Sequence, residues 1–170
     1  NFILGFGKID GQDVIVGGED FTVKGGSPNA AGLRKSVYTE DLAVKHKFPL
    51  VRLHEGGGGS VAGPSKEKKG YGGDPVFARS RFKSVAQTLK EVPVVSAALG
   101  PVAGLPASRF VGSHFRIMVK DNAQILVAGP AVVSRAFGTD FTKEELGGTD
   151  VHKKNGVTDN IAESEDCLLY

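Results

Sequence analysis

The chain has 170 residues, of which 40% are hydrophobic and 24% charged, and its formal net charge is +2. This balance is typical of a globular domain and argues against a general nucleic-acid binder or a membrane-surface binder. The longest apolar run, residues 92–99, is too short to cross a bilayer, and the single cysteine, Cys167, excludes an internal disulfide and a cysteine-based zinc site.

The first half of the chain predicts strands and helices separated by glycine turns. A turn is expected at Gly17-Gly18, between two short strands. Leu33, Val37 and Leu42 recur roughly on one face, which predicts an amphipathic helix around them. Strands are expected at residues 14–16, 21–24 and 48–53, and helices at residues 30–46 and 75–90.

The second half continues the alternation. Residues 92–99 form an uninterrupted apolar run, which is typical of a strand covered on both faces. Residues 100–106 predict a turn that leads into a short helix, and Cys167 is expected in the core. Two more strands are expected at residues 115–119 and 124–127, and helices at residues 130–137, 143–146 and 159–169. Repeated strand–helix alternation indicates an α/β domain with crossover connections.

Two predicted strands run directly into glycine turns. The strand at residues 48–53 leads to Gly56-Gly57, and the apolar run at residues 92–99 leads to Gly104-Leu105. Backbone N–H groups at such strand ends can converge on an oxygen that gains negative charge, which makes an oxyanion hole. Glycine turns are more often only turns, so this pattern leaves both interpretations open.

Three longer segments together resemble the β subunits of propionyl-CoA and methylcrotonyl-CoA carboxylases. They are DFTVKGGS at residues 20–27, MVKDNAQILVAGP at residues 118–130, and TKEELGGT at residues 142–149 with His152 shortly after. The similarity runs from about Val14 to Leu168 in the family's order and corresponds to its amino-terminal half. The resemblance implies a crotonase-like ββα superhelix. It also implies that residues 1–170 are one domain and a fragment of a longer chain.

The resemblance further implies a carboxyltransferase, which moves a carboxyl group from carboxybiotin to the α or vinylogous γ carbon of an acyl-CoA. In this reading the turns of Gly56, Gly57, Gly104 and Leu105 hold the enolate oxygen, with the N–H groups of Gly57 and Leu105 as donors. No protein base is needed, because the biotin anion left after decarboxylation can remove the proton.

Acyl-CoA binding is expected at the turn before the first helix. By resemblance, the CoA-binding residues are Gly25, Gly26, Ser27, Arg34 and Lys35. For Arg34 and Lys35, solvated surface charge is an equal alternative. Residues 66–69 are expected to form an exposed loop, which is another candidate for contacts with the CoA phosphates. The implied cofactor is biotin on a separate carrier, and no metal is expected. The implied partners are a biotin carboxylase or biotin carrier subunit and further copies of the chain, in the cytoplasm or the mitochondrial matrix.

Two departures from the family pattern keep other functions open. Leu105-Pro106 stands where a second glycine is usual, and His54-Glu55 stands where the family has Asp-Ser. Neighbouring residues of a strand point to opposite faces, so we expect His54 and Glu55 to be satisfied separately rather than act as an acid–base pair. Ser108 stands where crotonase hydratases keep a catalytic glutamate. Serine cannot serve as that acid or base, which argues against hydratase chemistry. The alternatives are a biotin-dependent acyl-CoA decarboxylase and a non-catalytic structural subunit of the same fold.

Overall fold

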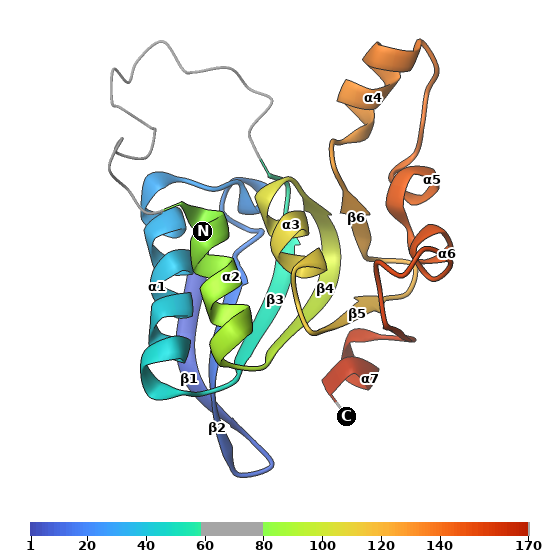
Figure 1. Ribbon diagram of the computed structural model, residues 1–170. Coiled ribbons are helices and arrows are strands. Elements are labelled where there is room, and N and C mark those ends of the chain that lie inside the picture. Colours follow the sequence, from blue (N-terminus) through green and yellow to red (C-terminus); the bar gives the residue numbers. More distant parts are fainter. Residues whose placement is uncertain (59–79, 170) are drawn as a thin grey trace.

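The structure, a computed structural model, describes residues 1–58 and 80–169 (Figure 1). The strands are β1 Phe2–Ile9, β2 Gln12–Glu19, β3 Leu50–Gly56, β4 Val94–Ala103, β5 Phe115–Val119, β6 Gln124–Leu126 and β7 Asn160–Ala162. The helices are the 3-10 turn η1 Lys24–Gly26, α1 Ala30–His46, α2 Arg81–Glu91, α3 Leu105–Val111, α4 Pro130–Phe137, α5 Lys143–Gly147, α6 Thr149–His152 and α7 Glu165–Leu169.

The described strands form one sheet in the order β1-β2-β3-β4-β5-β7, and β6 pairs with the far end of β4. Only the β1–β2 hairpin is antiparallel; every other described pairing is parallel. Strands β3 and β4 are parallel neighbours, with Leu50 opposite Val94, so the strands expected at residues 48–53 and 92–99 lie side by side. The parallel arrangement brings the carboxyl ends of β2, β3 and β4 to one edge of the sheet.

Helices α1 and α3 pack against the same face of the sheet, and α2 lies beside α1 (Figure 1). One core cluster joins Leu42 and Ala43 of α1 to Ile15, Leu50 and Val94 of the strands. A second cluster forms around Phe110 of α3 and Met118 of β5. Among the described helices, none is long and apolar enough to cross a membrane.

Several predicted elements have the expected bounds. The helix at residues 30–46 is α1, which Asn29 caps by accepting a hydrogen bond from Gly32 N–H at 2.7 Å. The strand at residues 115–119 is β5, and the helix at residues 130–137 is α4. The expected helix at residues 75–90 is observed as α2, which begins at Arg81 because Ser80 has an extended backbone; residues 75–79 lie outside the described residues.

Two predictions near the amino terminus are wrong. Gly17 and Gly18 lie inside β2 rather than in a turn, since a Cβ on Gly17 would be 2.9 Å from the Thr39 side chain of α1. Glycine there lets the helix approach the sheet closely. Residues 21–24 are not a strand, because Asp20 begins a turn that ends in η1. Strand β1 was not expected, although its eight residues all pair with β2.

Three later predictions also need correction. Residues 100–103 continue β4 rather than turn, because Pro101 and Val102 pair with β6 and Val102 also lies opposite Gly56. Strand pairing outweighs the local preference of glycine and proline. Residues 159–169 are not one helix, since β7 joins the sheet before α7 begins. Cys167 is exposed, and Leu168 is the α7 residue that packs on the core.

Candidate functional site

The carboxyl ends of β3 and β4 and the η1 turn surround a groove of about 520 Å³. The segments after β2, β3 and β4 form one side, and the segment after β6 with α4 and α5 forms the other. The described lining residues are Phe21, Lys24, Gly25, Ser27, Gly57, Gly58, Pro101, Ala103, Gly104, residues 126–132 and Lys143. Four of the residues predicted from the sequence, Gly25, Ser27, Gly57 and Gly104, therefore share one groove.

The first side of the groove is built by backbone packed on backbone. A Cβ on Gly26 would be 2.5 Å from the Glu55 carbonyl oxygen and 2.7 Å from Gly56 Cα. A Cβ on Gly58 would be 2.7 Å from the Ala103 carbonyl oxygen, and Gly58 has a φ of 67°. Side chains essentially never fit at such distances, so glycine is required for the three turns to meet.

The two predicted oxyanion donors, Gly57 and Leu105, differ in whether their N–H groups already have an acceptor in the described part of the protein. The N–H of Gly57 donates to the carbonyl oxygen of Gly25 at 2.9 Å, so this donor is engaged within the protein. Leu105 opens α3, and no backbone carbonyl in the described part of the chain accepts from its N–H. The first N–H groups of a helix have no partner inside the helix, which leaves the Leu105 donor available.

The backbone conformation of Gly104, the residue before α3, sets the direction of the Leu105 N–H. Its φ of 66° and ψ of −128° belong to a region that residues with a side chain rarely adopt. Leu105 is not among the residues that line the groove; it lines a separate cavity of about 20 Å³ with Gly26, Pro106 and Arg109.

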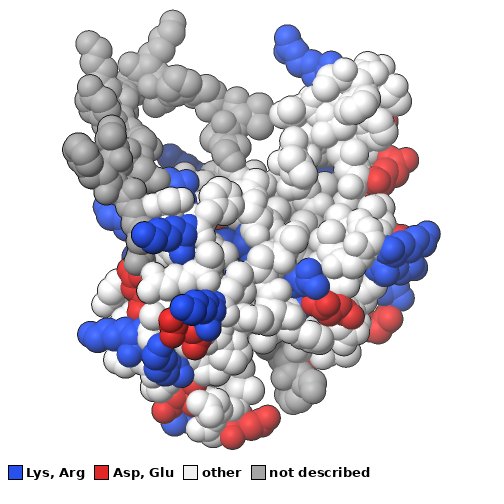
Figure 2. Space-filling model, viewed as in Figure 1, with Lys and Arg blue, Asp and Glu red and all other residues white. Residues whose placement is uncertain are grey.

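A second pocket of about 500 Å³ adjoins the groove, and both contain Gly104, Leu126 and Val127 in their lining. The remaining lining residues are mostly apolar: Ala107, Ser108, Val111, Ile125, His152 and Val157. Figure 2 shows that the surface over α3 and α4 is largely uncharged and that Lys and Arg gather toward the sides of this face. The pocket can take an apolar chain whose polar end lies in the groove.

The two lysines that line the groove were not among the CoA-binding residues predicted from the sequence. Lys24 and Lys143 line it, whereas Arg34 and Lys35 lie exposed on α1 and are absent from its lining. The Lys35 ammonium contacts the carbonyl oxygen of Phe2 at 3.4 Å. Residues 66–69 lie outside the described residues. The sequence could have indicated Lys24 as a residue of the groove, because it directly precedes Gly25-Gly26. It could not have indicated Lys143, because only the fold brings this residue to the groove.

His54 and Glu55 point to opposite faces of β3, as expected. His54 is buried, and its Nδ1 lies 3.0 Å from Glu19 Oε2. Burial alone would raise the pKa of Glu19, but the charge and hydrogen bond of His54 outweigh burial and hold that pKa below its ordinary 4.5. Burial and the neighbouring Glu165 raise the pKa of Glu55.

Beside this pair lies a second buried charge group. Glu40 Oε1 accepts from Arg52 Nη2 at 2.6 Å and from Arg109 Nε at 3.0 Å. Burial lowers the pKa of Arg52 to about 10 despite the attraction of Glu40. No cluster of three or more potential metal ligands occurs within residues 1–58 and 80–169.

Comparisons with known proteins give consistent relatives. A family described as "Carboxyl transferase domain" matches residues 2–170. The chain is 33% identical to the methylmalonyl-CoA decarboxylase subunit alpha of Veillonella parvula, over 98% of this chain and 32% of that protein. It is 32% identical to the propionyl-CoA carboxylase beta chain of Cereibacter sphaeroides, over 99% of this chain and 32% of that one.

Among solved structures, the chain is similar to the transcarboxylase 12S hexamer with bound methylmalonyl-coenzyme A and methylmalonic acid. The TM-score is 0.78 at 26% identity, and the match covers 99% of this chain and 31% of that one. The structure thus has the crotonase-like fold expected from the resemblance. The chain spans about a third of the length of the curated relatives it matches.

Proposed function

Because the chain belongs to the carboxyl transferase domain family, we propose that it is part of the carboxyltransferase component of a biotin-dependent acyl-CoA carboxylase. Such an enzyme transfers a carboxyl group to the α or vinylogous γ carbon of an acyl-CoA through an enolate. The observation that carries the proposal is the groove at which three glycine turns meet next to the start of α3, where the Leu105 N–H has no backbone acceptor among the described residues.

The groove supplies what enolate formation requires of the protein. A thioester oxygen that gains negative charge needs preorganised donors about 2.7–3.1 Å away in a site that excludes water. Leu105 offers one N–H at the start of α3. Gly57 becomes the second donor when the thioester oxygen replaces the Gly25 carbonyl that its N–H now contacts at 2.9 Å. Gly56 and Gly104 aim these donors as the preceding residues of the two turns.

Carboxybiotin, carried on a separate protein or domain, would supply the carboxyl group and, once this is lost, the base for the α-proton. The described residues fit this division of labour, since the charged residues that line the groove are Lys24 and Lys143 and no carboxylate or histidine is among its lining. The part of the site that this chain provides therefore holds and orients the thioester and leaves proton removal to the biotin.

For CoA we propose that the phosphates lie near Gly25, Gly26 and Ser27. Lys24 and Lys143 can contact them inside the groove, because phosphate oxygens form charge-assisted hydrogen bonds with ammonium groups. Arg34 and Lys35 remain proposed for the nucleotide end, since α1 begins close after Ser27. The acyl chain would enter the adjoining apolar pocket beneath Val127.

We also propose that the 170 residues form one domain of a longer chain that assembles with further copies and with a biotin carboxylase or biotin carrier subunit. A second candidate is the reverse reaction, an acyl-CoA decarboxylase. It is supported by the 33% identity to the methylmalonyl-CoA decarboxylase subunit alpha. A non-catalytic subunit is the third, because the Gly57 donor is engaged with Gly25.

The test uses the full-length chain assembled with its biotin-bearing partners. Incorporation of labelled bicarbonate into a panel of acyl-CoAs measures carboxylation, and release of CO₂ from methylmalonyl-CoA measures decarboxylation. Gly57→Pro removes one N–H donor and should lower kcat by about 10²–10³-fold, whereas Gly57→Ala keeps the donor and serves as the matched control. A wild-type assembly with neither activity would support the structural subunit.

A further inference from the structure

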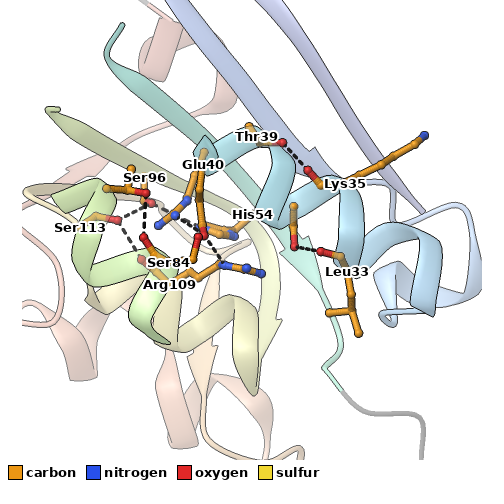
Figure 3. A network of polar contacts seen from close by, with 12 residues as sticks. Leu33, Lys35, Thr39, Glu40, His54, Ser84, Ser96, Arg109 and Ser113 are labelled. Carbon is orange, nitrogen blue, oxygen red and sulfur yellow. Dashed lines mark hydrogen bonds and ion pairs between the residues drawn. The ribbon is translucent and has the colours of Figure 1, made fainter. Parts of the chain in front are cut away.

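A chain of polar side chains, most of them buried, runs across β2, β3 and β4. Figure 3 labels its members His54, Ser96 and Ser113. Glu19 at the end of β2 contacts His54 Nδ1 on β3 at 3.0 Å, and His54 Nε2 lies 3.3 Å from Ser96 Oγ on β4. Ser96 Oγ lies 2.7 Å from Ser113 Oγ, and Ser113 donates to the Arg109 carbonyl of α3 at 2.8 Å. The chain ties together the four elements that carry the turns of the groove.

Proton counting fixes the direction of these hydrogen bonds. A hydroxyl group has one proton, and Ser113 uses its proton on the Arg109 carbonyl. Ser96 must therefore donate to Ser113, and its oxygen is left to accept from His54 Nε2. Since His54 Nδ1 faces the Glu19 carboxylate, His54 donates from both ring nitrogens and forms a charged pair with Glu19.

The Glu19 side chain also touches the turn itself. A Cβ on Gly56 would lie 3.1 Å from Glu19 Cγ, so the stem of Glu19 packs directly against the backbone of Gly56. Gly56 Cα in turn is the atom against which Gly26 packs. The Glu19–His54 pair thus lies against the place where Gly57 N–H meets the Gly25 carbonyl.

The neighbouring charges reinforce this position. One small cavity is lined by Glu19, His54, Arg52 and Arg109, so the charged pair adjoins the Glu40–Arg52–Arg109 group. Arg109 belongs to α3, whose first residue is Leu105, and the Leu105 N–H has no backbone acceptor within residues 1–58 and 80–169. Buried charges are costly to desolvate and contribute little net stability against an apolar replacement, whereas they impose one geometry.

We propose that Glu19 and His54 are positioning residues for acyl-CoA chemistry: their buried pair holds the Gly25–Ser27 and Gly56–Gly57 turns in register, so that the Gly57 N–H is held at the Gly25 carbonyl, the point of the groove where the thioester oxygen would take its place. This inference rests on the proposed function for its catalytic consequence. The positioning itself has a readout that does not depend on activity, namely the hydrogen exchange of the Gly57 amide.

Two substitutions of His54 separate its two hydrogen bonds. In His54→Asn the amide nitrogen takes the place of Nδ1 and keeps the donor to Glu19. In His54→Gln the amide nitrogen reaches the place of Nε2 and keeps only the contact with Ser96. His114→Gln is the matched control, because His114 Nδ1 accepts from Val94 N–H at the opposite end of β4.

The variants are compared in the full-length assembly by residue-resolved hydrogen exchange and by steady-state kinetics. His54→Gln should speed exchange of the Gly57 amide about 10- to 100-fold and lower kcat by a similar factor, with the acyl-CoA KM within about threefold. His54→Asn, which keeps the hydrogen bond to Glu19 but not the charge, should speed exchange only about 3- to 10-fold, and His114→Gln should stay within about threefold of wild type in both measurements. If His54→Gln does not fold, Glu19→Gln, which keeps the acceptor but removes its charge, should give exchange about 3- to 10-fold faster.

The outcomes separate the two claims. Unchanged Gly57 exchange in His54→Gln, or an equal increase in His114→Gln, would overturn the positioning role even if the wild type is an active carboxylase. Fast exchange in a wild-type assembly that carboxylates nothing would overturn it as well. Slow exchange in an inactive wild type, sped up by His54→Gln, would uphold the positioning role and reject the proposed function.

Discussion

The two sides of the groove are built differently. On one side, the turns after β2, β3 and β4 contact each other through glycine backbone, and buried charges lie behind them. On the other side, Val127 is 97% exposed, Phe137 is 75% exposed, and α4 has no buried residue. Figure 1 shows α4 projecting away from the sheet.

This difference assigns the sides separate tasks. Backbone donors must be held to within fractions of an ångström, which requires dense packing and a single geometry. A surface with exposed apolar side chains and few internal contacts is held more weakly and can adapt to what covers it. We therefore expect changes on the first side to be costly to the fold and changes on α4 to leave the fold largely intact.

The largest expected loss comes from the buried charges. Glu40→Leu leaves Arg52 and Arg109 without their shared carboxylate in the core, and it should lower the free energy of unfolding by about 3–5 kcal/mol. Urea denaturation measures the change. Lys47, which pairs with Glu91 at the surface, provides the control: Lys47→Ala should cost under about 1 kcal/mol. Equal losses would contradict the distinction.

The next effect concerns the glycine turns. Gly26→Ala introduces a Cβ against the Glu55 carbonyl at a φ of 66° and should destabilise the protein by about 2–3 kcal/mol. Gly129→Ala is the matched change on the other side, where nothing lies within 4 Å of the added atom. It should change the unfolding free energy by less than about 0.5 kcal/mol. Thermal or urea unfolding compares the two, and a tolerant Gly26 would refute the packed-backbone description.

The sequence predicted the local elements and the family but not the contacts between distant segments. The helix at residues 30–46 followed from its periodicity, and the family followed from three motifs of eight or more residues. The pairing of Glu19 with His54 could not be predicted, because it depends on which strands become neighbours. Likewise, the sequence placed Gly57 in a turn, but its bond to the Gly25 carbonyl depends on how two distant turns pack.

A smaller effect should appear at acid pH. The pKa of Glu19 in the folded protein lies below its ordinary 4.5, so the pair adds stability above that pH and loses it as pH falls through the lower folded value. Wild type should therefore lose stability below about pH 4.5 more steeply than Glu19→Gln, which cannot titrate. Urea midpoints between neutral pH and about pH 3 measure the slope. Parallel slopes would show that Glu19 does not contribute.

The smallest expected effect lies on α4. Phe137→Ser should change the unfolding free energy by less than about 0.5 kcal/mol, since the ring is 75% exposed and its only described ring contact is with Phe141. Denaturation of wild type and variant side by side provides the measurement. A loss above about 2 kcal/mol would mean that α4 is held as firmly as the glycine turns.

The central claim is that backbone N–H groups of Gly57 and Leu105 take the thioester oxygen of an acyl-CoA. Isotope-edited infrared difference spectroscopy of propionyl-CoA labelled with ¹³C at its carbonyl, bound to the full-length assembly, measures this directly. We predict that the carbonyl stretch shifts to lower frequency on binding and that Gly57→Pro reverses much of the shift while Gly57→Ala retains it. A bound carbonyl whose frequency equals that in water, or a shift that Gly57→Pro leaves intact, would contradict the account.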